Sequence, residues 1–147
     1  MITALFLTNA LATWFLTGLI WTIQCVHYPL FARVGAEAFP AYESEHTRRI
    51  TWIVGPPMLL ELVTSAALVV WRPAEFGSWW AWSGLALVGI VWVSTVVLQV
   101  PQHERLAKGF DANAHRLLVL SNWVRTAAWS ARAALILYAF VRIWSIG

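Results

Sequence analysis

Four histidines are the residues of this sequence most suited to chemistry. They are His27, His46, His103 and His115. Imidazole titrates near neutral pH and is a common ligand of zinc, copper and iron, so a histidine cluster could transfer protons or hold a transition metal. The spacings match no recognised zinc or haem signature. Ordinary polar residues at a membrane edge therefore remain the alternative to a site.

The site hypothesis has a smaller and a larger form. The smaller form needs only His27 and His103, which could act as acid–base groups, as metal ligands or as the two axial ligands of a haem. The larger form adds His46 and His115 as metal ligands. The cofactor expected from either form is a transition metal or haem.

Three charged residues lie deep inside long apolar stretches. At about 1.5 Å per helical residue, Arg125, Glu61 and Arg132 lie roughly 12, 16 and 22 Å from the ends of their stretches. A charge this deep costs at least ~2.5–3.5 kcal/mol on insertion scales. We therefore predict that Glu61 pairs with one or both arginines. Such a pair could serve a function, or it could only fix the packing of two helices.

Polar residues also recur every three or four positions along the apolar stretches, which places each set on one helix face. The polar pocket predicted from these faces contains Gln24, His27, Glu61, Gln99, His103, Asn122 and Arg125. Catalytic roles are assigned to His27, His103, Glu61 and Arg125, and substrate binding to Gln24, Gln99, Asn122, Trp21 and Trp129. The alternatives are that the amides only bond helices together and that the tryptophans only pack.

The elements that must position these residues are transmembrane helices. Of the 147 residues, 60% are apolar and 12% are charged, whereas soluble domains have roughly 45–50% apolar and about 25% charged residues. Four apolar stretches, at about 3–30, 50–71, 79–100 and 117–146, are long enough to span a bilayer. The first has no preceding basic residue and no small-residue cleavage site, so we interpret it as a retained helix. We predict an all-α fold, a four-transmembrane-helix bundle with residues 1–147 as one integral membrane domain.

The basic residues predict the orientation of the bundle. The first and third loops are flanked by Arg33, Arg48, Arg49, Arg105, Lys108 and Arg116, whereas the opposite side has Arg72 and Arg142. The positive-inside rule then places loops 1 and 3 in the cytoplasm and both termini outside, on the same side. The net charge of +3 is explained by this topology, so no nucleic-acid partner is expected.

Glycine and proline predict where the helices turn. The first loop should turn at Gly35, with a new helix starting near Pro40. The Gly55–Pro57 segment should bend or break the second helix. The third loop should turn near Gly109, with Asp111 as the cap of the last helix.

The two halves of the chain could be a weak repeat. The first half contains Gln24, His27, Gly35 and His46, and the second contains Gln99, His103, Gly109 and His115. Two repeated helical hairpins of this kind would be related by an axis along the membrane normal. The spacings differ between the halves, so chance similarity is the alternative.

The last third of the chain resembles a known family. Val100-Pro101, Leu106 and the Asn122-Trp123-Val124-Arg125-Thr126 segment are similar to the anthrone-oxygenase-like family of small four-helix bacterial membrane proteins, which has an Asn and an Arg-Thr pair at the start of its last helix. Asn122 and Arg125 match that motif. The His27–Phe31 and Pro56–Glu61 segments resemble an uncharacterised bacterial subgroup. The resemblance implies oxygenation of an aromatic polyketide at the bacterial inner (cytoplasmic) membrane.

Three functional hypotheses follow. The first is a membrane oxidoreductase or oxygenase that acts on a small aromatic or quinone-like molecule entering from the lipid. The second is a proton-linked carrier that uses Glu61, and four spans would then favour a homo-oligomer. The third is a structural or accessory membrane subunit. Nucleophilic-triad, phosphate-loop and nucleotide-binding motifs are not found in the sequence.

Overall fold

The computed structural model describes residues 1–73 and 75–146, and the side chains of all these residues except Trp144 and Ile146. Four long helical spans make up the described chain. The first consists of α1 (Ile2–Thr22), the π-helical η1 (Ile23–His27), α2 (Tyr28–Leu30) and the 3₁₀-helical η2 (Phe31–Arg33). The second is α3 (Phe39–Val70), the third is α4 (Ser78–Ser94) with η3 (Thr95–Gln99) and α5 (Val100–Leu106), and the fourth is α6 (Ala112–Ile146).

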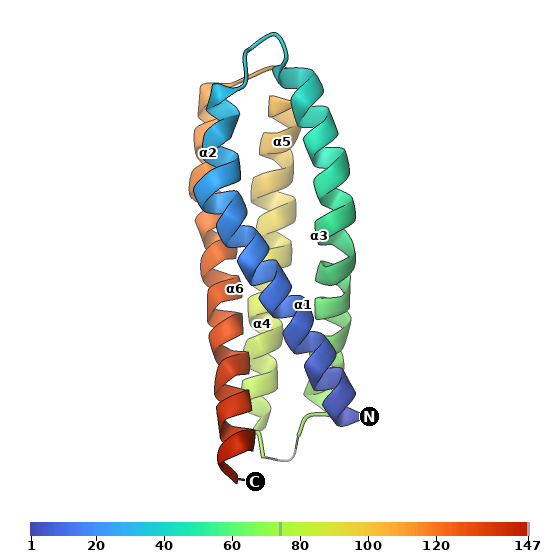
Figure 1. Cartoon of the computed structure of the whole chain (residues 1–147). Helices are drawn as coiled ribbons and strands as arrows, with labels where there is room; N and C mark the ends of the chain where they lie inside the picture. Colours follow the sequence, from blue (N-terminus) through green and yellow to red (C-terminus); the bar gives the residue numbers. More distant parts are fainter. Residues whose placement is uncertain (74, 147) are drawn as a thin grey trace.

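The four spans form an up-and-down bundle (Figure 1). α1 packs against α3 and α6, and α4 packs against the same two helices. Both termini lie at one end of the bundle, and the loops before α3 and before α6 lie at the other (Figure 1). All four spans are long and apolar enough to cross a membrane. The predicted four-helix membrane bundle is therefore confirmed.

Two of the helices begin earlier than the apolar stretches that define their spans. α3 begins at Phe39 and α6 at Ala112, because polar residues continue both helices beyond the bilayer core. Pro40 lies in the first turn of α3, as predicted. Gly109 has φ +145, and Asp111 Oδ1 accepts hydrogen bonds from the backbone N–H groups of Asn113 and Ala114. The predicted turn and helix cap are confirmed.

The second helix is not broken at Gly55–Pro57, so the break is wrong as one of the two predicted outcomes, and the bend stays a prediction. Pro56 and Pro57 lie inside the continuous 32-residue α3. Each proline removes one backbone N–H donor, but adjacent spans and local adjustment make this tolerable in membrane helices. Pro56 faces outward, so its ring does not disturb the bundle interior.

A wide helical turn precedes a proline in both hairpins. η1 precedes Pro29, and η3 precedes Pro101. Proline cannot donate the normal helical hydrogen bond and crowds the preceding turn, so a π-turn is one way to continue the helix. The two hairpins therefore share a local backbone feature, in keeping with the predicted repeat. Both π-turns lie in the half of the bundle that ends at loops 1 and 3.

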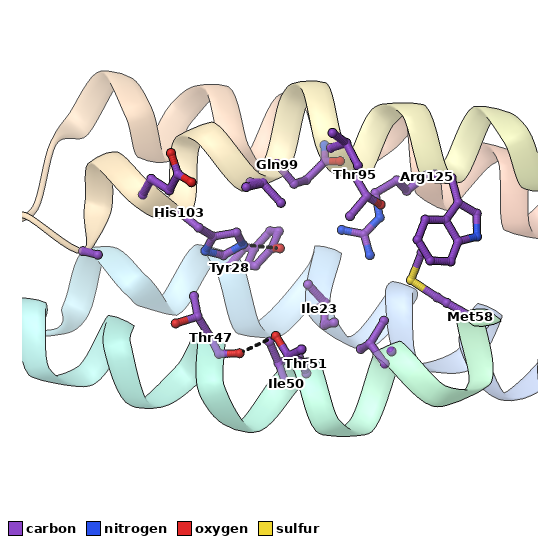
Figure 2. Close-up of a pocket in the computed structure, with 17 residues that line it drawn as sticks. Ile23, Tyr28, Thr47, Ile50, Thr51, Met58, Thr95, Gln99, His103 and Arg125 are labelled. Carbon is purple, nitrogen blue, oxygen red and sulfur yellow. Dashed lines mark hydrogen bonds between the residues drawn. The ribbon is translucent and has the colours of Figure 1, made fainter.

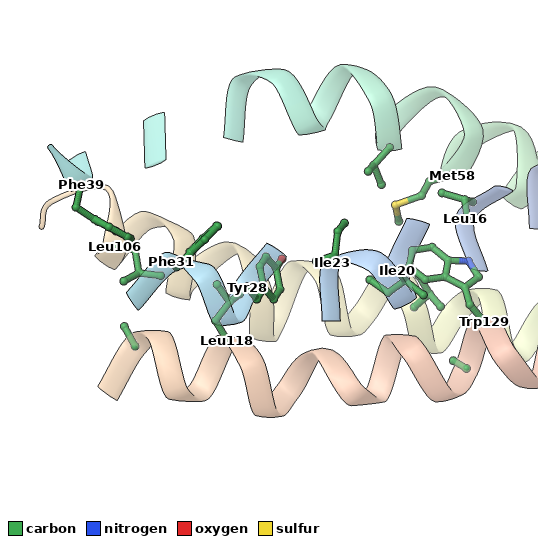
Figure 3. Packing of buried hydrophobic residues seen from close by; sticks show 14 residues of the cluster. Leu16, Ile20, Ile23, Tyr28, Phe31, Phe39, Met58, Leu106, Leu118 and Trp129 are labelled. Atoms are coloured by element: carbon green, nitrogen blue, oxygen red, sulfur yellow. The ribbon is translucent and has the colours of Figure 1, made fainter. Parts of the chain in front are cut away.

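The buried apolar side chains form two clusters along the bundle. The larger cluster extends from Phe31 and Phe39 near the loops to Leu16 and Trp129 near the middle (Figure 3). The smaller cluster lies toward the termini and contains Phe6, Leu68, Trp80 and Ile136. Lipid is as apolar as these side chains, so close packing and polar contacts, rather than escape from water, hold the helices together.

Candidate functional site

Glu61 and Arg132 form an ion pair in the middle of the bundle. Arg132 Nε lies 3.2 Å from Glu61 Oε1. Thr13 Oγ1 donates to the same oxygen at 2.7 Å, and Trp129 Nε1 donates to Glu61 Oε2 at 2.9 Å. The prediction that Glu61 pairs with an arginine is confirmed, and the partner is Arg132. Arg125 takes no part in this pair.

A second nitrogen of Arg132, Nη2, also donates hydrogen bonds. Arg132 Nη2 donates to Asn9 Oδ1 at 2.8 Å, to Ser65 Oγ at 3.0 Å and to Thr13 Oγ1 at 3.2 Å. We call this set the closed cluster: Asn9, Thr13, Glu61, Thr64, Ser65, Trp129 and Arg132. Each of these residues is at most 6% exposed. The closed cluster joins α1, α3 and α6 through satisfied hydrogen bonds.

A cavity of about 610 Å³ lies in the loop-end half of the bundle. Its walls come mainly from α3 on one side and from η3 and α5 on the other (Figure 2). Val96 and Val100 line it and are 60% and 42% exposed, so the cavity reaches the lipid-facing surface between these helices. This volume is within the usual range for small-molecule sites, roughly 300–1,000 Å³.

The cavity walls are mostly apolar, with a few polar groups on the inner side. The apolar and small lining residues are Ile23, Ile50, Val54, Gly55, Met58, Trp92, Val96, Val100 and Ala107. The polar ones are Tyr28, Thr47, Thr51, Thr95, Gln99, His103, Glu104 and Arg125. Apolar walls with a small number of placed polar groups are typical of a site that binds a small organic molecule.

Two of these groups and a buried carboxylate form a hydrogen-bonded array. His103 Nδ1 lies 2.5 Å from Glu43 Oε1, and His103 Nε2 lies 3.0 Å from the Tyr28 hydroxyl. Glu43 is fully buried. With a carboxylate on Nδ1, the neutral ring carries its proton there and accepts from tyrosine at Nε2. We call this set the Glu43–His103–Tyr28 array, and Figure 2 shows its Tyr28–His103 contact at the cavity.

Arg125 enters the same cavity from α6 (Figure 2). It is only 6% exposed, its guanidinium lies 5.1 Å from the Trp129 ring centroid, and the Tyr28 hydroxyl is its polar neighbour. None of the ion pairs in the described part of the chain includes Arg125. Its Nε has no hydrogen-bond partner among the described residues. A buried cation therefore borders the cavity without a carboxylate counter-charge.

The four histidines lie at the same end of the bundle, and the His46 ring lies near those of His27 and His103, with centroid distances of 4.7 and 5.6 Å. His27 Nε2 lies 2.9 Å from His46 Nδ1, and His115 Nε2 lies 2.8 Å from the Tyr28 carbonyl oxygen. Both ring nitrogens of His103 are occupied by Glu43 and Tyr28. Residues 1–73 and 75–146 contain no group of three or more His, Cys, Asp or Glu side chains that could hold a metal ion. The metal or haem site stays a prediction, because no group of three or more ligands in this part of the chain supports it.

The predicted substrate-binding residues divide into two groups. Gln99 lines the cavity, where its amide also donates to Ser121 Oγ at 3.1 Å. Gln24 and Asn122 bond to each other at 2.8 Å between η1 and α6. Trp21 is 43% exposed and donates to Ser130 Oγ at 3.0 Å, and Trp129 belongs to the closed cluster. Gln24, Asn122, Trp21 and Trp129 therefore join helices in this structure.

Glu43 and Tyr28 are the residues of the array that sequence reasoning missed. The buried face of α3 contains Phe39, Glu43, His46, Val54, Met58 and Glu61. Counting back from Glu61 in steps of three and four reaches Glu43, so the helical period could have placed both carboxylates on one face. Glu45 and Glu104 are the carboxylates that directly neighbour histidines in the sequence. Glu45 instead binds Arg48 and Arg49 at the surface.

Comparisons of the chain with protein-family models, with curated proteins and with solved structures found no match.

Proposed function

We propose that the protein is a membrane-embedded enzyme that performs an acid–base step on a small, largely apolar molecule taken from the bilayer. The observation that carries this proposal is the Glu43–His103–Tyr28 array, which ends at the cavity wall. In this array a buried carboxylate orients an imidazole, and the imidazole bonds a hydroxyl. Enzymes use this arrangement to move protons.

The array can transfer a proton in a defined direction. As the Tyr28 oxygen takes a proton from the substrate, the tyrosine hydroxyl gives its own proton to His103 Nε2. The resulting imidazolium is stabilised by Glu43 on Nδ1 at 2.5 Å. Burial of Glu43 strengthens this interaction because little water screens it. The same groups acting in reverse would protonate a product.

The side opening suits a substrate that dissolves in lipid. Val96 and Val100 lie both in the cavity wall and on the outer face, so an apolar molecule can enter without crossing water. The resemblance in the last third of the chain suggests aromatic polyketides as the first substrate class to test. With loops 1 and 3 in the cytoplasm, the cavity would open into the cytoplasmic half of the inner membrane.

The carrier hypothesis has less support. It needs Glu61 to exchange protons with water, but Glu61 is 1% exposed and accepts hydrogen bonds from Thr13, Trp129 and Arg132. We therefore place Glu61 in the structure-maintaining part of the bundle and the Glu43–His103–Tyr28 array in the reactive part.

The test uses 1,8-dihydroxyanthrone with the protein in phosphatidylcholine nanodiscs under air. Its oxidation to the anthraquinone consumes one dioxygen, releases one water and begins with loss of a ring-carbon proton, and absorbance measures the product. We expect Tyr28→Phe and His103→Gln to lower the rate by roughly 10²-fold or more, the usual size of an acid–base contribution. Tyr138→Phe is the matched control, since Tyr138 is 45% exposed on α6.

A second variant tests the cavity itself. A Cβ added at Gly55 meets nothing within 4 Å, and Gly55 lines the cavity, so Gly55→Phe should fill it and stop turnover. Gly18→Phe, at an exposed glycine with equal free space, should leave the rate unchanged. Full activity in Tyr28→Phe and His103→Gln would contradict the proton relay. A wild-type rate no higher than in empty nanodiscs would contradict the substrate class.

A further inference from the structure

Arg125 is a buried cation without a counter-charge among the described residues. It lies thirteen residues into α6, about 20 Å along the helix from Ala112, and it is 6% exposed. A central arginine costs at least ~2.5–3.5 kcal/mol on insertion scales, and such residues normally pair with an opposite charge. The ring of Trp129 and the hydroxyl of Tyr28 are its neighbours. Neither of these groups provides a full negative charge.

A second unpartnered donor lines the same cavity. Trp92 Nε1 and Arg125 Nε are both buried without a hydrogen-bond partner in the described part of the chain, and both residues line the cavity. Buried donors are nearly always satisfied in native proteins, so an exception needs an explanation. Both nitrogens are covered in this structure, so a bound molecule would accept from them after a small movement of either side chain.

We propose that the cavity binds an oxyanion carried on an apolar body, with the oxyanion on Arg125 and the apolar part between α3 and η3. This inference rests on the cavity of the proposed function and adds the class of molecule that it holds. Carboxylate and phenolate oxygens accept charge-assisted hydrogen bonds from guanidinium, and these are about twice as strong as neutral ones. The apolar body of the molecule then lies against the cavity walls formed by Ile50, Val54 and Met58.

Two sources share this chemistry, a small aromatic acid and an anionic lipid. We favour the small acid because Arg125 lies about 12 Å inside the apolar part of α6, whereas a lipid phosphate remains near the membrane surface. A small molecule can carry its oxyanion to this depth, with the array of Tyr28 and His103 beside it. In that position the acid would also present its ring to the proton relay.

The experiment measures binding by titration calorimetry in delipidated detergent, at neutral pH. The ligands are 1-hydroxy-2-naphthoate and its uncharged amide, 1-hydroxy-2-naphthamide. We expect the wild type to bind the carboxylate at least tenfold more tightly than the amide, and Arg125→Gln to bind the two equally. Arg116→Gln is the matched control, because Arg116 is an exposed arginine on the same helix. It should keep the wild-type preference.

The outcomes separate this inference from the proposed function. Equal binding of carboxylate and amide by the wild type, with both lost in Gly55→Phe, would overturn the oxyanion and leave the cavity enzyme intact. Phosphatidylglycerol that displaces the naphthoate from the wild type and fails to bind Arg125→Gln would support the oxyanion and identify lipid as its source. No Arg125-dependent binding of either the naphthoate or phosphatidylglycerol would overturn the inference.

Discussion

Arg125 and Arg132 lie two turns apart on α6 and are both buried, at 6% and 3% exposure, but their surroundings differ. Arg132 pairs with Glu61 and also donates to Asn9, Thr13 and Ser65. Arg125 borders a cavity of about 610 Å³ without a carboxylate partner in the described chain. Trp129 touches both regions, since its indole N–H binds Glu61 and its ring lies under Arg125.

The difference separates a structural role from a binding role. The closed cluster uses its charges to join three helices, which a membrane bundle needs because apolar contacts alone do not distinguish protein from lipid. The cavity is lined by Trp92 and Arg125, whose Nε1 and Nε donors have no partner among the described residues. Charged residues in membrane spans are often taken to mark function, but Arg132 is paired within the bundle, and we propose a binding role for Arg125 alone.

The largest effect is expected from removing one partner of the closed cluster. Arg132→Met leaves Glu61 buried without its counter-charge, and we expect it to destabilise the bundle by about 3–5 kcal/mol. Unfolding in mixed micelles by sodium dodecyl sulfate measures this difference. Arg116→Met, an exposed control on the same helix, should stay within about 0.5 kcal/mol of the wild type.

A double variant tests whether the pair acts as a unit. Glu61→Gln alone should also destabilise, since it leaves Arg132 unpaired. Combined with Arg132→Met, it should cost less than the sum of the single changes, because neither charge then remains buried alone. Strict additivity of the two changes would mean that the 3.2 Å contact contributes no coupling.

A smaller loss of stability is expected from changing Thr13. Its hydroxyl donates to Glu61 and accepts from Arg132. Thr13→Val keeps the shape but removes both bonds, and we expect a loss of about 1.5–3 kcal/mol, the usual value for hydrogen bonds to charged groups. The same unfolding assay measures it. Thr95→Val is the comparison at the cavity wall, where the hydroxyl bonds only to the Val91 carbonyl oxygen. A similar loss in both variants would remove the distinction between the two regions.

A further prediction concerns the fit of Arg132 against α4. A Cβ at Gly84 would lie 2.7 Å from Arg132 Nη1. The guanidinium group is held in place by the hydrogen bonds of Nε and Nη2. We therefore expect Gly84→Ala to destabilise by about 1–3 kcal/mol through overpacking. Gly89→Ala, on the same helix with nothing within 4 Å, should be neutral or slightly stabilising. Equal stability of the two variants would show that Arg132 moves freely.

The sequence predicted the bundle well because the bilayer imposes simple rules. Apolar length determined the spans, and Asp111 and Gly109 marked the start of α6. Of the bend or break expected at Gly55–Pro57, the break was wrong because a membrane helix tolerates prolines. The pairing of Glu61 followed from the cost of a buried charge.

The site was harder to predict because it depends on rotation of each helix as well as on depth. Residues at similar depth were grouped into one pocket, but Glu61 faces the closed cluster while His103 and Arg125 face the cavity. The π-turns η1 and η3 change the helix phase just before Tyr28 and His103, and no periodic count includes such turns. For this reason Gln24 and Asn122 were grouped with the cavity, whereas Glu43, on the regular α3, was missed because the period was not counted back from Glu61.

The most direct test of this account is the stability of Arg125→Met beside that of Arg132→Met, measured without ligand in the same unfolding assay. Since Arg125 has no counter-charge to leave behind, we expect Arg125→Met to be neutral or more stable than the wild type, while Arg132→Met loses about 3–5 kcal/mol. A loss in Arg125→Met as large as that in Arg132→Met would show that both arginines maintain the fold, and it would contradict the separation of closed cluster from binding cavity.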